Sequence, residues 1–354
     1  MGPRPRRLVR KLGLSLASVA VFLGAAELIC RAAGYAPRSD SFRWMAHPQL
    51  QAVPMPDQRT WFGREDPATG QTRLPITINR YSQRGPDYPL EKSTGEHRIV
   101  VVGDSLTMGQ GVRDVEGYPA VLGQLLAGDA ADEGGPRVVN AGVNGWATWH
   151  YMRWAQTQLG RFRPDVLVVG LYLGNDMVVP RNAPLAIPVP LENTLRGSAL
   201  YRFLVETYRA SLWKRVEAAR RDLSVEELDA ELERYKGLAE SELSDDDQRV
   251  LWEQHALPHL EAARDACDEA GVALAVLLLP SYPMVLTEAP PPVYGFLRER
   301  LEAAGLPTIE CIEPVRSAGD AAWLSYDVGH LSVLGNRLVA EALRDGLERL
   351  ELAR

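Results

Sequence analysis

From residue 98 onward, short apolar runs alternate with amphipathic stretches, and this alternation restricts the fold more than any other feature of the sequence. The runs rich in valine, isoleucine and leucine are residues 98–102, 137–140, 165–171, 272–279 and 308–312. The stretches with helical spacing include residues 118–126, 148–159 and 333–350. Short continuous apolar strands separated by helices are typical of a parallel sheet covered on both faces. We therefore expect a three-layer α/β/α domain over residues 98–350, with a mainly parallel sheet of five strands.

One segment interrupts this alternation between the third and fourth predicted strands. Four prolines lie between residues 180 and 190, and a charged sequence with helical spacing follows to about residue 257. We therefore predict a helical insertion at about 181–257. A lid over the functional site, a partner surface and a solvated spacer are all compatible with it, and charged helical faces are most often simply solvated.

The first thirty residues have the pattern of a signal anchor or a secretory signal. Five arginine and lysine residues lie within residues 1–11, and residues 12–30 form an apolar run whose only charge is Glu27. Because a basic flank stays in the cytoplasm, the rest of the chain is expected outside the cytoplasmic membrane. We expect an uncleaved transmembrane helix rather than secretion after signal cleavage. The proline-rich residues 31–97 are expected to form a loosely structured lead-in to the domain.

Charge and cysteine content argue against several classes of protein. The net charge is −7, which disfavours nucleic acid as a partner because phosphate binding needs a basic face. Three cysteines provide neither a disulfide framework nor the spacing of metal ligands. A bridge between Cys267 and Cys311 is conceivable, but two unpaired buried thiols are favoured. We expect no metal and no cofactor.

The first predicted strand runs directly into a turn that carries a serine. Residues 99–105 read I-V-V-V-G-D-S, and two further glycines follow at 109 and 111. Such a turn either cradles a phosphate or presents a nucleophile. The phosphate-binding patterns G-x-x-x-x-G-K-[ST] and G-x-G-x-x-G are both missing from this stretch. The turn is therefore interpreted as the site of a nucleophile, Ser105.

A serine nucleophile needs a base, and His330 is the strongest candidate among the six histidines. Ligand sites in an open parallel sheet form beyond the carboxyl ends of the strands. Ser105 follows the first such end, and His330 is expected in a loop after the last strand and before the final helix. Asp327, three residues earlier, is positioned to hold the Nδ1–H of the histidine. The alternative is a turn-forming aspartate beside a helix-capping histidine.

Two further strand ends carry groups that can stabilise an oxyanion. Gly142 follows the second strand, and its backbone N–H can approach a substrate closely because no Cβ is in the way. Asn175 follows the third strand and brings a side-chain amide. With the N–H of Ser105, these donors form the predicted oxyanion hole.

Taken together, these residues resemble the SGNH, or GDSL-type, hydrolases over about residues 98–340. The first block of that family matches Gly103-Asp104-Ser105-Leu106, the second Gly142, the third Asn175 and the fifth Asp327-x-x-His330. The resemblance implies a flavodoxin-like fold, Ser105 as nucleophile, His330 as base and Asp327 as its orienting partner. One departure is Leu173, which stands where the third block usually has glycine.

The amino-terminal part is similar to membrane-anchored members of the superfamily. The similarity rests on Glu27-Leu28-x-x-Arg31-x-x-Gly34 after the apolar run and on residues 79–86, which read N-R-Y-S-Q-R-G-P. This resemblance favours the uncleaved membrane anchor.

The expected activity is hydrolysis of a carboxylic ester on a small molecule, lipid or glycan through an acyl-serine intermediate. Two alternatives remain open: an O-acyltransferase acting on envelope polysaccharide, and a non-catalytic scaffold of the same fold. Trp146 and Trp149 follow the Gly142 turn as a candidate sugar-stacking platform, although buried aromatic residues are the commoner explanation.

Overall fold

The computed structural model describes residues 3–33, 42–62, 74–127, 136–174, 176–177, 189–201, 203–204, 207, 245–287, 289–325 and 327–353. The chain divides into two compact units. The smaller unit comprises Met1–Ser41 with Leu185–Asp229, and the larger comprises Phe42–Pro184 with Ala230–Arg354.

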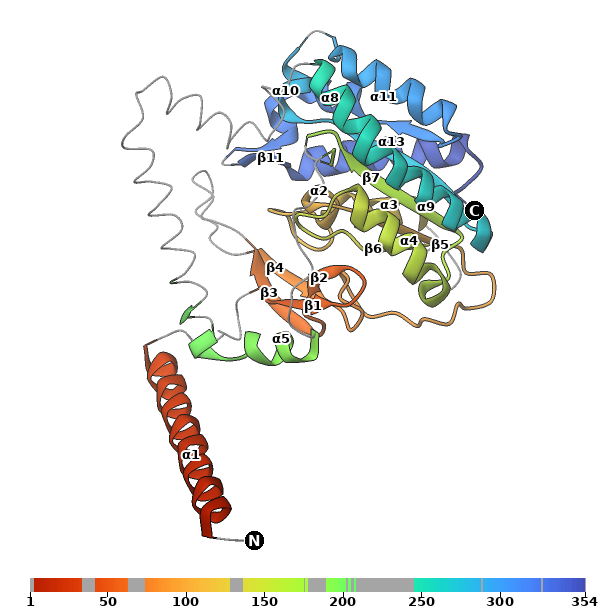
Figure 1. Cartoon of the computed structure of the whole chain (residues 1–354). Helices are drawn as coiled ribbons and strands as arrows, with labels where there is room; N and C mark the ends of the chain where they lie inside the picture. The colour runs from red at the N-terminus through yellow and green to blue at the C-terminus, as the bar shows by residue number, and fades with distance from the viewer. Residues whose placement is uncertain are drawn as a thin grey trace. The chain divides into compact units, whose positions relative to one another are not determined.

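Five parallel strands form the centre of the larger unit (Figure 1). They are β5 (Arg98–Gly103), β6 (Arg137–Asn140), β7 (Val166–Tyr172), β8 (Ala273–Leu279) and β9 (Thr308–Glu310). Their spatial order is β6-β5-β7-β8-β9, and every neighbouring pair is parallel. This is the flavodoxin-like order, and it confirms the predicted fold. The order reverses between β5 and β7, so the end of β5 is where a ligand site is expected.

Helices cover both faces of this sheet (Figure 1). One core contains residues of α4 (Thr148–Phe162), α9 (Leu257–Ala270) and α11 (Pro292–Ala303), and the other contains residues of α3 (Tyr118–Ala127), α12 (Ile312–Ala318) and α13 (Val333–Arg349). Alternate residues of β5 enter the two cores, because successive side chains of a strand point to opposite faces. Cys267 lies in the first core and Cys311 in the second, and both thiols are free.

The segment expected to be a loosely structured lead-in contains two antiparallel ladders. Strands β1 (Trp44–His47) and β2 (Gln51–Pro54) form the first, and β3 (Gln58–Phe62) and β4 (Leu74–Ile78) form the second. The strands have only four or five residues, and prolines lie within two of them, so the sequence pattern is weak. Burial holds them in place, since alternate side chains of β4 are nearly inaccessible.

The smaller unit contains α1 (Pro3–Ala32) and α5 (Val189–Arg196). Residues Val9–Ala32 are long and apolar enough to cross a membrane, a test that a signal sequence also passes. Glu27 accepts hydrogen bonds from the Ser198 hydroxyl at 2.7 Å and from the N–H groups of Ala199 and Leu200 at 3.0 and 2.9 Å. Arg31 pairs with the same carboxylate at 2.8 Å. The single charge of the apolar run therefore joins two distant segments of this unit.

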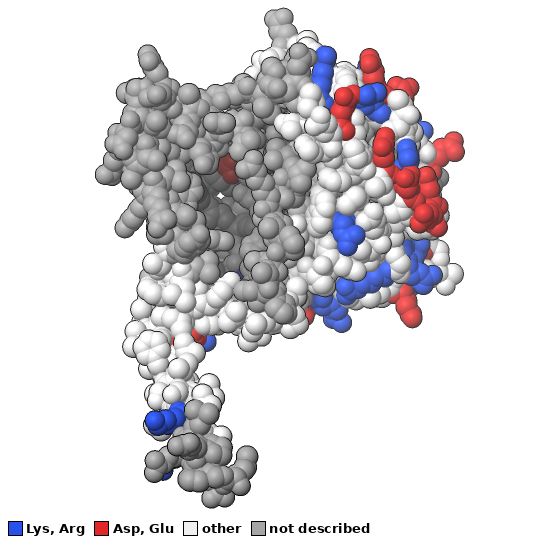
Figure 2. Space-filling view, viewed as in Figure 1, with Lys and Arg blue, Asp and Glu red and all other residues white. Residues whose placement is uncertain are grey.

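The described parts of the predicted insertion are helical. They include α5 and α8 (Asp245–Leu251), and a π-helical turn, η1 (Trp252–Ala256), leads into α9. Pro258 has no N–H to donate, which accounts for a break in regular α-helical bonding at this point. Residues 208–244 of the insertion lie outside the described residues. On the face that Figure 2 shows, acidic and basic side chains of the larger unit are interspersed.

Candidate active site

Ser105 is the first residue of a short helix that begins directly after β5. This helix is α2 (Ser105–Met108). Asp104 caps its amino-terminal end, because its Oδ1 accepts the Leu106 N–H at 2.9 Å. The turn before it needs glycine, because a Cβ on Gly103 would lie 1.9 Å from Thr107 Oγ1. Strand, glycine and cap together present Ser105 at the carboxyl end of the sheet.

Ser105, His330 and Asp327 are connected by a chain of two hydrogen bonds. His330 Nε2 is 2.9 Å from Ser105 Oγ, and His330 Nδ1 is 2.8 Å from Asp327 Oδ2. The segment is not the loop that we expected. It is a short strand, β11 (Asp327–Leu331), paired with β10 (Trp323–Leu324). When Nδ1–H donates to the carboxylate, Nε2 is free to accept the serine proton.

Asn336 fixes the position of the strand that carries His330. Its side-chain amide donates to Leu331 O at 3.1 Å and to Ser332 O at 3.0 Å, and its Oδ1 accepts the Tyr118 N–H at 2.9 Å. Asn336 is 1% exposed, so these bonds are shielded from water. Sequence reasoning missed this residue, because an asparagine one turn into a helix gives no signal of its own.

Gly142 packs against the backbone of α2. A Cβ at this position would lie 2.4 Å from Met108 N and 2.7 Å from Thr107 C. Its N–H, predicted as an oxyanion donor, donates to Asn140 Oδ1 at 3.0 Å. Asn140 Nδ2 in turn donates to Thr107 O at 2.9 Å. The asparagine therefore ties the Gly142 turn to the serine helix.

The predicted third oxyanion donor, Asn175, lies outside the described residues. Its neighbour Asp176 is described and fully buried. The Asp176 carboxylate accepts the Tyr172 N–H at 2.7 Å and the Tyr151 hydroxyl at 3.0 Å. The turn after β7 is thus anchored on both the strand and helix α4.

These features agree with a comparison of the sequence with known families. The GDSL-like lipase/acylhydrolase family model matches residues 101–338 of the 354-residue chain. The chain belongs to this family. As a member it is an ester-hydrolysing enzyme. A separate comparison with curated proteins found no match.

Two of the solved structures that match the chain are an esterase and a lipase/acylhydrolase, both at low sequence identity. The esterase EstA from Pseudoalteromonas sp. is 12% identical, with 72% of this chain and 98% of that chain covered and a TM-score of 0.41. A lipase/acylhydrolase from Enterococcus faecalis is 16% identical, with 72% and 96% covered and a TM-score of 0.39.

Two buried carboxylates lie behind the serine of this acylhydrolase. Burial raises the pKa of Asp104 to about 6, although backbone N–H groups of the α2 turn and the nearby His330 oppose the shift. Burial also raises the pKa of Asp176, and the charge of Asp104 raises it further. Asp104 Oδ2 is buried and has no hydrogen-bond partner among the residues that the structure describes. Within the described part of the chain, no group of three His, Cys, Asp or Glu is placed to hold a metal ion.

Arg84 connects the amino-terminal segment to the loop after α2. Its side chain is 2% exposed and pairs with Asp114 Oδ1 at 2.9 Å. It also donates to the carbonyls of Met108 and Val112, each at 2.6 Å, and to that of Gly109. This arginine belongs to the N-R-Y-S-Q-R-G-P motif, which the sequence analysis noted without assigning a role. These hydrogen bonds hold the backbone that follows Ser105, and we call them the Arg84 clamp.

Trp146 and Trp149 pack around His150. The Trp146 ring stacks on that of His150 with centroids 5.4 Å apart, and the Trp149 ring meets it edge-on at 5.0 Å. Trp146 is 5% exposed, and its Nε1–H donates to Ala52 O at 3.2 Å. Burial lowers the pKa of His150 to about 4, so this ring is neutral. One face of Trp146 is therefore occupied by protein, whereas Trp149 is half-buried.

Proposed function

We propose that this acylhydrolase cleaves carboxylic esters through an acyl-serine intermediate, with Ser105 as nucleophile, His330 as base and Asp327 as its orienting partner. The observation that carries the proposal is the hydrogen-bonded series of Ser105, His330 and Asp327. Its first link, of 2.9 Å, joins Ser105 to His330, 225 positions away, and its second, of 2.8 Å, joins His330 to Asp327, three positions away. A nucleophile, a base and an orienting carboxylate in series are what acyl transfer needs.

In the proposed reaction, Ser105 Oγ attacks the ester carbonyl carbon while His330 Nε2 takes the hydroxyl proton. The tetrahedral intermediate collapses, the bond to the alcohol oxygen breaks, and His330 gives its proton to the departing alcohol. Water then attacks the acyl-serine, again with His330 as base, and the acid and free serine are released. Asp327 stabilises the imidazolium that forms in each half-reaction.

The proposed oxyanion hole consists of the N–H groups of Ser105 and Gly142 and the amide of Asn175. Each such donor contributes about 10²-fold or more to the rate. In the structure the Gly142 N–H donates to Asn140 Oδ1. A developing negative charge accepts a hydrogen bond more strongly than a neutral amide oxygen, so the Gly142 N–H is expected to turn toward it during the reaction.

The membrane location is part of the same proposal. The basic flank in residues 1–11 and the apolar helix Val9–Ala32 support a single-pass signal anchor with the catalytic unit outside the cytoplasm. Intact mass spectrometry of the protein purified from membranes tests it. A chain that keeps its first residues supports the anchor, and a chain shortened near residue 26 supports secretion after cleavage.

The activity test uses the full chain in detergent. Release of p-nitrophenol from its acetate by the native enzyme, together with its loss in Ser105→Ala, supports the proposal. A fluorophosphonate that labels the native enzyme but not Ser105→Ala gives the same answer without turnover. Catalysis by Ser105→Ala at the native rate contradicts it, and absence of any Ser105-dependent reaction favours the scaffold.

The acyl acceptor is tested by adding a glycan oligosaccharide to the same reaction. Hydrolysis releases the free acid at a rate that the oligosaccharide leaves unchanged. An acylated oligosaccharide in the mass spectrum, with faster release of p-nitrophenol, identifies an O-acyltransferase instead.

A further inference from the structure

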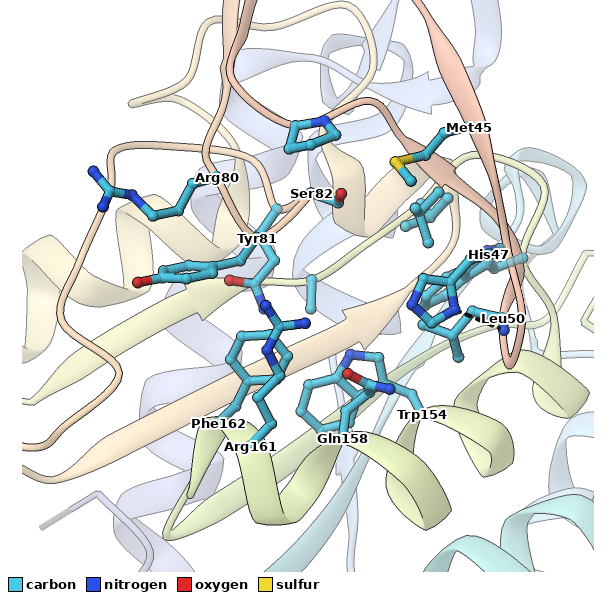
Figure 3. Close-up of a pocket in the computed structure, with 16 residues that line it drawn as sticks. Met45, His47, Leu50, Arg80, Tyr81, Ser82, Trp154, Gln158, Arg161 and Phe162 are labelled. Atoms are coloured by element: carbon cyan, nitrogen blue, oxygen red, sulfur yellow. Dashed lines mark hydrogen bonds between the residues drawn. The ribbon is translucent and has the colours of Figure 1, made fainter. Parts of the chain in front are cut away.

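A cavity of about 210 Å³ lies between the β1–β2 hairpin, the turn at residues 80–83 and helix α4 (Figure 3). Neither Ser105 nor His330 lines it. The segment after β6 separates the two sites, because Ala141 and Val143 line the cavity while Gly142 packs against α2. The cavity is thus a second site, behind the turn that carries a proposed oxyanion donor.

The wall of the cavity is aromatic and held in place by its own contacts. The rings of Trp154 and Phe162 stack with centroids 5.7 Å apart, and each side chain is 2% exposed. The Tyr81 ring meets that of Phe162 edge-on at 6.0 Å, and its hydroxyl donates to Tyr88 O at 3.0 Å. Trp154 and Phe162 therefore close the wall against each other, and the half-buried Tyr81 is the ring in this wall that a ligand can contact, with little loss of side-chain entropy.

Two hydrogen-bond donors, the neutral ring of His47 and the charged guanidinium of Arg161, lie at this wall. His47 Nδ1 accepts the N–H groups of Gln49 and Leu50, both at 3.2 Å, so the ring proton is on Nε2. Burial lowers the pKa of His47, and the charge of Arg161 lowers it further, which keeps this ring neutral. The Arg161 guanidinium lies 5.1 Å from the centroid of the Phe162 ring.

Arg161 is the charged group of the pair. Across the described residues it forms no ion pair, whereas the neighbouring Arg80 is bound to Asp87 at 2.6 Å. Arg161 also lies 5.7 Å from the centroid of the Tyr81 ring, so aromatic contacts on two sides orient it. A planar guanidinium held in this way is suited to a carboxylate, which it can bind through two parallel hydrogen bonds.

The remaining polar groups are suited to hydroxyls. Gln158 lines the cavity, and its Nε2 donates to Gln49 Oε1 and to Thr157 Oγ1, each at 3.0 Å, so its carbonyl oxygen is the group that can accept a ligand hydroxyl. Ser82 adds a hydroxyl from a turn in which its φ is +64°. The Asn79 side chain stabilises that turn by accepting the N–H groups of Tyr81 and Gln83 at 2.9 and 3.1 Å.

We propose that this cavity binds one carboxylated sugar ring, a hexuronic acid unit of a glycan. Its carboxylate pairs with Arg161 and the His47 Nε2–H, its apolar face packs against the Tyr81 ring, and its hydroxyls bond to Gln158 and Ser82. At about 30 Å³ of liquid volume per water, the cavity has the space of roughly seven waters, which suits a single pyranose ring. The site is independent of ester chemistry, so it is tested by binding alone.

The experiment measures binding of methyl β-D-glucuronide, methyl β-D-glucoside and benzoate to the full chain in detergent, by ligand-observed nuclear magnetic resonance. The glucuronide is expected to bind, and Arg161→Gln is expected to weaken it roughly tenfold or more. Arg153→Gln is the matched control. It removes the same charge from the same helix, at a side chain bonded to Gln156 and away from the cavity, and should leave binding unchanged.

Each other outcome overturns the proposal. Equal binding of the glucoside shows that the carboxylate is not recognised, and binding of benzoate without the glucuronide shows an aryl-acid site. Failure of all three probes to bind the native chain, or an Arg161→Gln variant that binds the glucuronide unchanged, removes the site. Because Arg161 is exposed, its substitution leaves the core intact, which a circular dichroism spectrum verifies.

Discussion

His330 Nδ1 lies 2.8 Å from Asp327 Oδ2 although the two residues are three positions apart on one short strand. Regular strand geometry sends such residues to opposite faces. Here Asp327 Oδ1 also accepts the Gly329 N–H at 3.2 Å, a local turn of the backbone around the carboxylate. One side chain therefore shapes the strand and orients the histidine.

Asp327→Asn is expected to lower kcat by about 10²-fold or more, because the amide can place its NH₂ toward the ring and favour the wrong tautomer. KM should change little, since the residue does not face the acyl group. Steady-state kinetics with p-nitrophenyl acetate measure both constants. Asp345→Asn is the control, because this exposed carboxylate on α13 is paired with its neighbour Arg344. Equal kcat values for native enzyme and Asp327→Asn would remove the aspartate from the mechanism.

Gly142→Ala tests the close approach between the Gly142 turn and the serine helix. The added Cβ meets backbone atoms of α2 at 2.4 and 2.7 Å, which cannot rotate away. A loss of about 1–3 kcal/mol in the free energy of unfolding is expected from this overpacking, with a loss of kcat as the helix shifts. Gly160→Ala, on α4 with open space around its Cβ, should be neutral or slightly stabilising. Urea denaturation compares the two variants.

Arg84→Lys is expected to reduce both stability and activity. A lysine ammonium cannot reproduce the fork of donors, so at least one buried carbonyl after α2 loses its partner, at a cost of about 1–3 kcal/mol. The rate of fluorophosphonate labelling should fall with it, which separates a displaced serine from a simple loss of folded protein. Arg80→Lys, in an exposed pair with Asp87, should leave the stability nearly unchanged. Labelling of Arg84→Lys at the native rate would show that the clamp does not position the serine.

The sheet and the serine turn could be predicted from the sequence because they depend on local patterns. Continuous apolar runs identify buried strands, and the predicted 137–140 matches β6 at both ends. The clamp by Arg84 could not be predicted, since its acceptors are backbone carbonyls 24 to 28 residues away. The strand at Asp327 was also missed. Its partner has two residues, and polar or glycine positions interrupt its apolar pattern.

Asp104→Asn tests whether the buried Asp104 carboxyl makes the free energy of unfolding depend on pH. The folded-state pKa of Asp104 is raised to about 6 from an ordinary 3.8, so the folded enzyme holds this proton more tightly than the unfolded chain does. The stabilisation from the proton is complete below about pH 4 and is lost as pH rises through 6. Two pK units correspond to at most about 3 kcal/mol.

Asparagine keeps the oxygen that accepts the Leu106 N–H and cannot ionise, so the cap survives while the pH dependence disappears. We therefore compare the free energies of unfolding of the native enzyme and of Asp104→Asn. The native value minus the variant value should be larger at pH 4.5 than at pH 7. Urea denaturation of both chains across this range measures the difference. Asp176 is present in both chains, but the charge of Asp104 raises its pKa only in the native enzyme, which adds to the pH dependence of the difference in the same direction. A difference that stays constant between pH 4.5 and 7 would mean that Asp104 is ionised throughout, and that its unpartnered oxygen is stabilised by a donor such as water.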